Sequence, residues 1–178
     1  MSAVLKPAER RELLVGCGND LRKKVHWDSS QNDWANVTTL DLDPEIGADV
    51  THDLNVLPLP FDDNTFDEVH AYEVLEHTGR QGDWKFFFDQ FGEFYRILKP
   101  GGFLAATVPM WDCEWAWADP GHTRIIAPGS LLFLNRSEYS QVGRTSMTDY
   151  RQWLKCDFEL VGRSEKEGSF GFILQARK

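Results

Sequence analysis

The stretch LLVGCGND, residues 13–20, runs from three apolar residues straight into two glycines that stand two positions apart. A short apolar run that ends at glycine is typical of a buried strand in a parallel sheet. Glycine loses more conformational entropy on folding than other residues, so Gly16 and Gly18 indicate a backbone that must be bare. Either the chain turns too sharply here for a Cβ atom, or a ligand lies against it.

Outward from this stretch, β-branched and apolar runs alternate with segments of helical spacing. We expect parallel strands at 12–15, 37–43, 47–54, 66–72 and 103–109. The clearest helix begins after an N-cap at Asp83 and carries aromatic residues at helical spacing as far as Leu98. KPGG, residues 99–102, ends this helix and turns the chain into the next strand.

The rest of the chain predicts a loop, a helix and a hairpin. Residues 110–128 are rich in aromatic side chains and are expected to form a loop, and 129–141 are expected to form one helix. The tail, 157–178, alternates around a charged turn that contains glycine, which is typical of a hairpin. The whole pattern predicts an α/β fold, a Rossmann-like, doubly wound and mostly parallel sheet with an antiparallel C-terminal hairpin strand.

Composition and charge limit what the chain can be. Its 178 residues favour a single domain over 1–178, and no apolar run approaches the length of a membrane span. The net charge of −9 argues against nucleic acid as a partner, because binding phosphates needs clustered Lys and Arg. The three cysteines are widely spaced without a C-x-x-C motif, which favours reduced thiols. We expect a cytoplasmic protein.

Polar residues follow the predicted strands at the edge where an open parallel sheet binds its ligands. Asp41 stands about 25 positions after Gly16, a spacing at which an acid can take the two hydroxyls of a ribose. A dinucleotide fingerprint has a third glycine where this chain has Asp20 or Leu21, and Asp20 would repel a pyrophosphate. The sequence therefore predicts an adenosine-type ligand that carries no phosphate.

Five motifs in this order resemble those of the class I S-adenosylmethionine-dependent methyltransferases: LLVGCGND, TTLDLDP, HDLNVLPLPFDDNTFDEV, EVLEH and RILKPGG. The likeness is to the small UbiE-like, methyltransferase type 11-like branch of bacteria and phages, and it covers roughly residues 12–109. ADPGHTR, residues 118–124, is similar to the D-P-x-H-x-R loop of that branch. The resemblance implies S-adenosyl-L-methionine as cofactor, with the loop and helix over 110–141 on the side of the methyl acceptor.

The resemblance implies roles around the cofactor for residues at the first two strand ends. The backbone of Gly16, Cys17 and Gly18 would border the methionine part of the cofactor. Asp41 would accept hydrogen bonds from both ribose hydroxyls, and Leu42 would pack on the adenine. As an alternative, Asp41 could cap the turn before a proline, although its place in the motif favours the ligand role.

The resemblance implies further cofactor contacts after the third and fourth strands. Asp53 would meet the adenine amino group, and the Leu54 amide would meet a ring nitrogen. The carbonyl groups of Ala71 and Tyr72 would accept hydrogen bonds from the ammonium group of the cofactor. Ordinary turn chemistry explains Asp53 about equally well. One departure from the family pattern is Leu14, since many class I enzymes have an acid at that position.

Methyl transfer from a sulfonium is an in-line displacement that depends mainly on alignment, and it needs a base only where the acceptor must lose a proton. The candidates for that base are His122, His77 and Glu73, with His122 first because it follows the fifth strand. As an alternative, His77 could close the start of a helix. Glu73, Glu76 and His77 have a spacing that some quinone-type O-methyltransferases use for a metal, but no further ligand is evident and we expect no metal.

The acceptor side is predicted around Trp111, Asp119 and Arg124, where the indole could stack on a flat or sugar-like acceptor. Alternatively, Asp119, His122 and Arg124 could simply hold their loop through hydrogen bonds. No Asn-Pro-Pro-Tyr-like motif follows the fourth strand, and the fifth ends in Pro109-Met110 rather than Pro-Cys, so nucleic acid is not the expected acceptor. We expect transfer to an oxygen or nitrogen of a small molecule, a saccharide or a lipid headgroup.

Two other functions fit the same residues. A nicotinamide-dependent oxidoreductase would share the glycine turn and the acid at Asp41. A non-catalytic relative that binds S-adenosylmethionine could act as a partner subunit. Only about ten residues precede the first strand, so we expect the cofactor to be partly open to solvent or covered by a partner chain, such as a second copy in a homo-oligomer.

Overall fold

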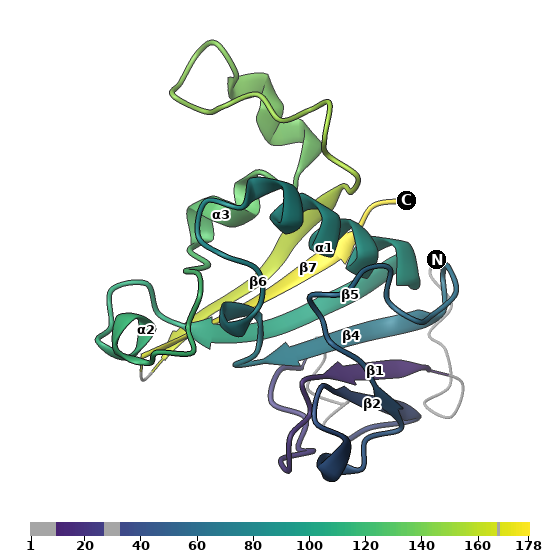
Figure 1. The fold of residues 1–178 in the computed structure, drawn as a ribbon. Helices are drawn as coiled ribbons and strands as arrows, with labels where there is room; N and C mark the ends of the chain where they lie inside the picture. The colour runs from purple at the N-terminus through teal and green to yellow at the C-terminus, as the bar shows by residue number, and fades with distance from the viewer. Residues whose placement is uncertain (1–9, 27–32, 167) are drawn as a thin grey trace.

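A seven-stranded sheet with the order β3-β2-β1-β4-β5-β7-β6 organises the structure, a computed structural model that describes residues 10–26, 33–166 and 168–178. Its strands are β1 (Glu12–Val15), β2 (Val37–Asp41), β3 (Val50–Thr51), β4 (Phe66–Tyr72), β5 (Leu98–Pro109), β6 (Phe158–Lys166) and β7 (Ser169–Ala176). The neighbouring strands β3, β2, β1, β4 and β5 run parallel to one another, whereas β7 runs antiparallel to its two neighbours, β5 and β6. The predicted mostly parallel sheet with an antiparallel C-terminal hairpin is confirmed (Figure 1).

The strand order reverses between β1 and β4. From β1 the chain proceeds to β2 and β3 on one side and then returns to β4 on the other side of β1. In open parallel sheets such a switch point leaves a crevice at the carboxyl ends of the two strands. Val15 pairs with Ala71 at that edge, so Gly16 and the residues after Tyr72 border the crevice.

The helix predicted from aromatic spacing is α1 (Trp84–Ile97), and its N-cap is Asp83 as expected. The Asp83 side chain accepts a hydrogen bond from the Phe86 N–H at 3.1 Å. Phe91 and Phe94 are fully buried in the same core as the apolar side chains of β4 and β5. The periodic aromatic stripe therefore holds α1 against one face of the sheet, as Figure 1 shows.

β5 begins at Leu98 rather than at Phe103, the start expected from the sequence. Leu98 already pairs with Phe66, and the register shifts before Phe103 pairs with Glu68. Gly101 has a φ of +78°, a conformation that glycine adopts at little cost, so the chain can bulge between the two pairings. KPGG thus ends the helix as predicted but lies inside the strand.

The segment after β5 differs from its prediction in two places. The expected loop over 110–128 contains a short helix, α2 (Trp115–Ala118), and the expected helix over 129–141 is divided into α3 (Pro128–Leu132) and the 3₁₀ helix η4 (Arg136–Gln141). Asn135 causes the division, because its side chain accepts the Ser137 N–H at 2.9 Å and so starts a new turn.

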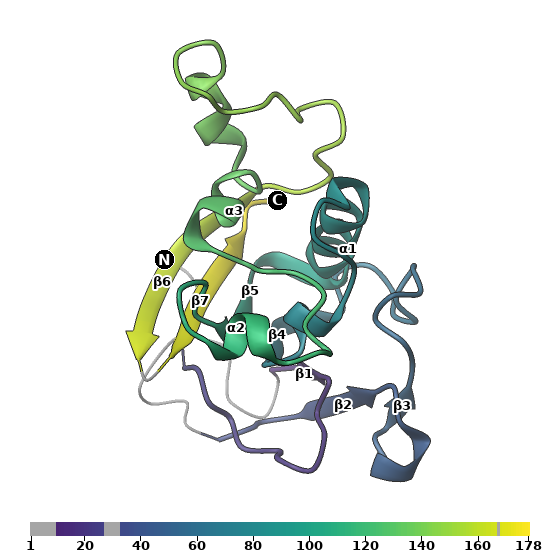
Figure 2. The same ribbon diagram turned by 60° about the vertical axis from the view of Figure 1, so that its left-hand side comes forward.

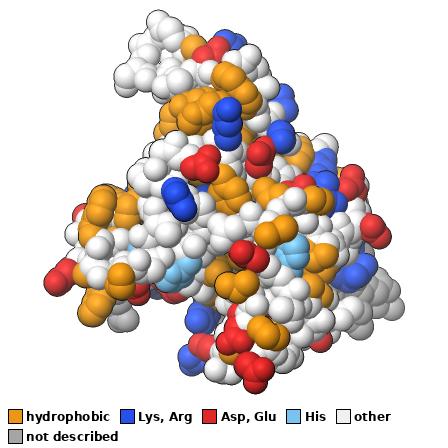
Figure 3. All heavy atoms as spheres, viewed as in Figure 1, with side chains coloured by type: hydrophobic (Ala, Val, Ile, Leu, Met, Phe, Trp, Pro, Cys, Tyr) orange, Lys and Arg blue, Asp and Glu red, His pale blue; other side chains and the backbone are white. Residues whose placement is uncertain are grey.

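α3 covers the same face of the sheet as α1, as the two views in Figures 1 and 2 show. α2 lies beyond the carboxyl end of β5 and exposes Trp115 and Trp117 by 72% and 71%. Hydrophobic side chains protrude at that end of the molecule in Figure 3. Of the helices in the described segments, none combines the length and apolar character that crossing a bilayer requires.

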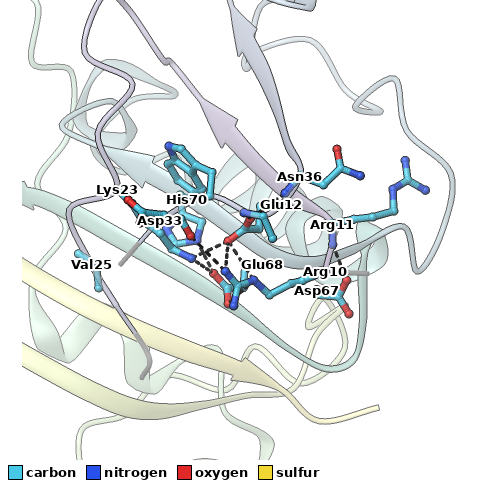
Figure 4. Close-up of polar contacts among 12 residues, drawn as sticks. Arg10, Arg11, Glu12, Lys23, Val25, Asp33, Asn36, Asp67, Glu68 and His70 are labelled. Carbon is cyan, nitrogen blue, oxygen red and sulfur yellow. Dashed lines mark hydrogen bonds and ion pairs between the residues drawn. The ribbon is translucent and has the colours of Figure 1, made fainter. Parts of the chain in front are cut away.

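A buried charge network covers the opposite face of β1 and β4 (Figure 4). The Lys23 ammonium lies 2.5 Å from a Glu12 carboxylate oxygen and 2.7 Å from one of Glu68. His70 Nε2 lies 2.9 Å from the same Glu68 oxygen, and its Nδ1 lies 2.6 Å from the Tyr72 hydroxyl. Buried charges are costly unless paired, so this network fixes the segment around Lys23 on the sheet.

We expect the free energy of unfolding to fall as the pH is lowered from 7 to 5. Burial lowers the pKa of His70, so the unfolded chain binds a proton at this residue at a pH where the folded protein does not. Burial would raise the pKa of Glu68, but hydrogen bonds from His70 and Lys23 hold it below its usual range, so its contribution is lost only under more acidic conditions.

Urea unfolding of the wild type and of His70→Gln at pH 7, 6 and 5 measures this contribution. The free energy of unfolding should depend less steeply on pH in the variant than in the wild type. The difference in slope should be at most about 1.4 kcal/mol per pH unit, the value for a single proton. Equal slopes in the two proteins would show that His70 does not carry the dependence.

Candidate active site

A cavity of about 360 Å³ lies at the switch point of the sheet. It is bordered by the residues that follow β1, β2 and β4 and by the short 3₁₀ helix η3 (Leu75–His77). The predicted cofactor residues in its lining are Gly16, Gly18, Asp41, Leu42, Asp53 and Leu54. The structure therefore brings together six of the nine residues predicted to surround a cofactor.

The two glycines have different physical roles. Both have positive φ angles, +60° at Gly16 and +49° at Gly18, which L-residues with a side chain rarely adopt. A Cβ atom on Gly16 would lie 2.3 Å from Val74 Cγ2, whereas no atom lies within 4 Å of the corresponding position on Gly18. Gly16 thus allows the turn after β1 to approach the turn after β4, and Gly18 leaves its peptide open toward the cavity.

Asp41 connects the end of β2 to the glycine turn. One carboxylate oxygen accepts the Gly18 N–H at 2.8 Å, and the other accepts the Asp43 N–H at 3.0 Å. A carboxylate has about four acceptor sites, so each oxygen can still accept a hydroxyl. Next to it Leu42 is 64% exposed. Two free acceptor positions beside an exposed apolar side chain fit the ribose and the base of a nucleoside.

The rim of the cavity is acidic. Asp43 and Glu45 are exposed on the turn after β2, and Figure 3 shows acidic side chains gathered over this part of the molecule. Among the described residues that line the cavity there is no Lys or Arg. No cationic side chain in this lining could pair with a phosphate, so the negative charge at the rim favours a nucleoside that carries a positive group.

Asp53 and Asn55 form a turn after β3. One Asp53 oxygen accepts the backbone N–H of Asn55 at 2.8 Å and its side-chain amide at 2.9 Å. The Asn55 side chain in turn accepts the Gly79 N–H at 2.8 Å, which joins this turn to the segment after η3. Asp53 thus has a turn-forming role, and its second oxygen is available to a ligand.

Three predicted cofactor residues do not line this cavity. Cys17 and Tyr72 are buried with Leu14 on the opposite face of the sheet, and Ala71 is fully buried in the main core. The Tyr72 hydroxyl accepts the N–H groups of Lys24 and of the next residue, both at 3.2 Å. Burial raises the pKa of the Cys17 thiol, consistent with a packing role for this side chain. Their backbone contacts to a cofactor stay predictions.

Glu73 borders the cavity in a strained conformation. It has a φ of +50°, which is uncommon for any residue but glycine and is often found at functional sites. Its backbone N–H donates to the Thr107 carbonyl at 2.8 Å, and its carboxylate accepts the Ser169 hydroxyl at 2.9 Å. Contacts with β5 and β7 therefore hold Glu73 at the edge of the cavity.

His77 and His122, predicted as candidate bases, lie together although they are distant in sequence. Their ring centroids are 4.7 Å apart in an edge-to-face arrangement, and His77 also lines the cavity. Glu76, which the sequence did not single out for catalysis, lies beside them and is 2% exposed. Burial raises the pKa of Glu76 to about 8. No local pattern in the sequence indicated that this glutamate is buried.

Arg124, predicted on the acceptor side, is buried and bonds within the protein. It donates to the Leu75 carbonyl at 2.9 Å, to the Thr78 hydroxyl at 2.8 Å and to the Gln90 side chain. Burial lowers the pKa of Arg124 to about 10, so the guanidinium keeps its charge at neutral pH. These bonds tie η3 to α1, which supports the alternative that Arg124 holds its loop.

The other two predicted acceptor residues belong to the same loop region. Asp119 accepts the Gly121 N–H at 2.7 Å, and it thereby shapes the turn that precedes His122. Trp111 is half-buried and packs edge-to-face on Phe170 with ring centroids 5.8 Å apart. Both residues shape the segment after β5, and their contact with an acceptor stays a prediction.

A second, larger cavity of about 540 Å³ lies between the start of α1 and α3. Aromatic side chains dominate its lining, with Trp84 and Phe87 from α1 facing Phe133 and Tyr150. The sequence assigned the α1 aromatics to the core, and only the fold shows that those on its first turn border an open cavity.

Known proteins with solved structures share this architecture. A methyltransferase dependent on S-adenosylmethionine from Archaeoglobus fulgidus aligns with a TM-score of 0.57 over 93% of this chain and 86% of its own, at 14% identity. A chain from the complex of the Trm112 methyltransferase activator with a methyltransferase of Haloferax volcanii aligns with a TM-score of 0.60 over 95% and 83%, at 15% identity. The fold is thus that of class I methyltransferases.

The sequence comparison identifies the family. The profile of the methyltransferase domain matches residues 13–106, and the chain therefore belongs to this family. A curated relative, sterol 24-C-methyltransferase of Kluyveromyces lactis, is 33% identical over 69 residues, which are 39% of this chain and 17% of the relative. The chain thus matches only a small part of that protein.

We expect Gly16→Ala to destabilise the protein by about 1–3 kcal/mol more than Gly18→Ala, because only the first substitution adds overpacking against Val74 to the cost of a positive φ. Urea unfolding of both variants measures the difference. Adding Val74→Ala should recover much of the loss in Gly16→Ala and none in Gly18→Ala. Equal losses in the two single variants would contradict the packing role of Gly16.

Proposed function

We propose that this chain is an S-adenosylmethionine-dependent methyltransferase that acts on an oxygen or nitrogen of a small acceptor, such as a metabolite, a saccharide or a lipid headgroup. The observation that carries the proposal is the bond from the Gly18 N–H to Asp41 at the switch point, beside a cavity of nucleoside size. When bound, S-adenosylmethionine would supply a methyl group on a sulfonium: an acceptor oxygen or nitrogen would bond to the methyl carbon while the carbon–sulfur bond breaks and S-adenosylhomocysteine leaves. Family membership over residues 13–106 supports the same reaction.

Different residues of this cavity would contact different parts of such a cofactor. Asp41 would accept the ribose hydroxyls with the lone pairs that its two backbone partners leave free. Leu42 would cover one face of the base, and the second oxygen of Asp53 would accept its amino group. The open peptide at Gly18 would allow close approach of the remaining part of the cofactor.

The acceptor site is proposed beyond η3. Thr78 borders the cofactor cavity and Arg80 borders the larger aromatic cavity, so the short segment between them separates the two spaces. A volume of about 540 Å³ with aromatic walls suits the apolar part of a small molecule. His77 lines the cofactor cavity and its ring contacts that of His122, which supports a role for either histidine as the base that takes a proton from the acceptor.

A partner chain over the cofactor is a second element of the proposal. The Haloferax volcanii structure is a complex of a methyltransferase with its activator. Here α2 offers the strongly exposed Trp115 and Trp117, side chains that are enriched in protein interfaces. This surface fits two alternatives: this chain is the catalytic one and needs a partner, or it is a non-catalytic subunit of a catalytic partner. Methyl transfer by the isolated chain would exclude the second alternative.

Calorimetry with S-adenosylhomocysteine tests the cofactor site. We expect the wild type to bind it and not to bind NAD, and Asp41→Asn to weaken binding roughly ten- to hundredfold, since a hydrogen bond to a charged group contributes about 1.5–3 kcal/mol. Asp43→Asn is the matched control, because it removes a carboxylate from the same turn. The Asp43 side chain accepts the Glu45 N–H, and Asp43 is not among the residues that line the cavity.

Unchanged affinity in Asp41→Asn would remove Asp41 from the site, and binding of NAD in place of S-adenosylhomocysteine would favour an oxidoreductase. Incubation with methyl-labelled S-adenosylmethionine and a panel of small acceptors then tests transfer. Binding without transfer to any acceptor, with the isolated chain or with its purified partner, would leave the non-catalytic function.

A further inference from the structure

The two cavities that meet at the segment after η3 differ in charge. The lining of the proposed cofactor cavity contains no Lys or Arg among the described residues, and its three acids are Asp41, Asp53 and Glu73. The larger cavity, called the aromatic cavity below, has two arginines, Arg80 and Arg124, and only one acid, Asp83. In a chain with a net charge of −9, an excess of arginine in one cavity indicates that a negative group binds there.

Arg124 brings a buried cation to the lining of the aromatic cavity. It is only 6% exposed, and it forms no ion pair with a described residue. Its Nε and Nη2 donate to neutral oxygens of Leu75, Thr78 and Gln90, whereas Nη1 has no hydrogen bond to a described residue. Nη1 is not among the unpartnered atoms that are sealed from solvent, so it faces accessible space. Because a buried charge without a counter-ion is costly, a bound anion would stabilise this guanidinium.

Arg80 is the second cation of this lining. Its side chain is exposed and has no hydrogen bond or ion pair with a described residue. Three other exposed arginines are instead paired with carboxylates close to them in the chain: Arg22, Arg151 and Arg163. Because Arg80 and Arg124 border the same cavity, a single bound anion would be attracted to both guanidinium groups.

The uncharged polar side chains of the lining offer further donors. Gln81 accepts the Ile125 N–H at 2.9 Å through its amide oxygen, so its amide nitrogen remains available to a ligand. Ser130 accepts the Ala127 N–H at 3.4 Å and keeps its own hydroxyl hydrogen. Asp83, the one acid, is occupied as the N-cap of α1. A lining with this many donors suits a carboxylate, which only accepts hydrogen bonds.

Aromatic rings form the apolar walls of the same cavity. The ring centroid of Tyr150 lies 5.3 Å from that of Trp84, 5.2 Å from that of Phe88 and 5.8 Å from that of Phe133. All four rings, together with Phe87, belong to the lining. Aromatic side chains bind flat rings by stacking and edge-to-face contact. The volume of about 540 Å³ is in the range of cavities that take small organic ligands.

We propose that the aromatic cavity selects a small aromatic carboxylic acid, whose carboxylate binds Arg80 and Arg124 and whose ring packs against the aromatic walls. The two arginines exceed Asp83 by one charge, which matches a carboxylate better than a doubly charged phosphate. That this acid is the methyl acceptor rests on the proposed methyltransferase function, whereas its binding does not. The cationic cofactor would then bind beside acids and the anionic acceptor beside arginines, so each cavity disfavours the ligand of the other.

Calorimetric titration with 2-naphthoate and with its uncharged analogue 2-naphthamide tests the site. We expect the wild type to bind 2-naphthoate at least about tenfold more tightly, because only the carboxylate can form charge-assisted hydrogen bonds with arginine. Arg80→Gln should weaken binding of 2-naphthoate about tenfold and leave that of 2-naphthamide unchanged. Arg144→Gln is the matched control, because Arg144 is exposed and lies outside the lining. Phe133→Leu should weaken binding of both ligands alike.

Equal affinity of the wild type for the two ligands, or binding of neither, would overturn the proposal. Equal weakening of 2-naphthoate in Arg80→Gln and Arg144→Gln would show unspecific attraction and would also overturn it, as would tighter binding of 2-naphthyl phosphate than of 2-naphthoate. Arg80 is substituted rather than Arg124 because the bonds of Arg124 hold η3 to α1. Circular dichroism confirms that each variant is folded.

Binding of S-adenosylhomocysteine by the same samples separates this proposal from the proposed function. Preference for 2-naphthoate without binding of S-adenosylhomocysteine would keep the acid site and overturn the methyltransferase function. Binding of S-adenosylhomocysteine without preference for 2-naphthoate would overturn the acid site alone.

Discussion

The hydrogen bond from the Gly18 N–H to Asp41 is the contact on which the candidate site depends. It joins the carboxyl ends of β1 and β2, two neighbouring parallel strands, at the point where the strand order reverses. Gly16 and Gly18 both have positive φ angles in this turn, and Val74 approaches the chain where Gly16 has no side chain. Backbone freedom, sheet order and a single carboxylate together create the cavity.

The two faces of the sheet support this turn in different ways. Successive residues of β4 alternate between them: Val69 and Ala71 lie in the apolar core under α1, whereas Glu68 and His70 face the charge network. Lys23 binds that network soon after the glycine turn ends. The pairing of buried charges thus anchors the segment that follows Gly18, in a place where the described residues form no helix.

The region proposed for the acceptor is organised by η3 rather than by the strands themselves. Arg124 ties η3 to α1 through Leu75 and Gln90, and the same short helix carries Glu76 and His77. The proposed cofactor site is thus formed by strand ends and the turns that follow them, and the proposed acceptor site by side chains from α1 and several loops.

The sequence by itself indicated the order of the strands and α1 with its Asp83 cap, because hydrophobic period and capping act over a few residues. The third predicted strand, 47–54, is shortened to β3, Val50–Thr51. Of the six predicted residues that line the cavity, the glycines and Asp41 followed from local pattern as well, whereas Leu42, Asp53 and Leu54 followed only from the resemblance to a family. Tertiary structure decided the early start of β5, the break at Asn135 and the internal partners of Arg124. It also decided the meeting of Glu76 with His122, which no local pattern encodes. Contacts between residues far apart in the chain depend on how loops pack once the sheet has formed, and burial of a side chain such as Glu76 is a property of that packing.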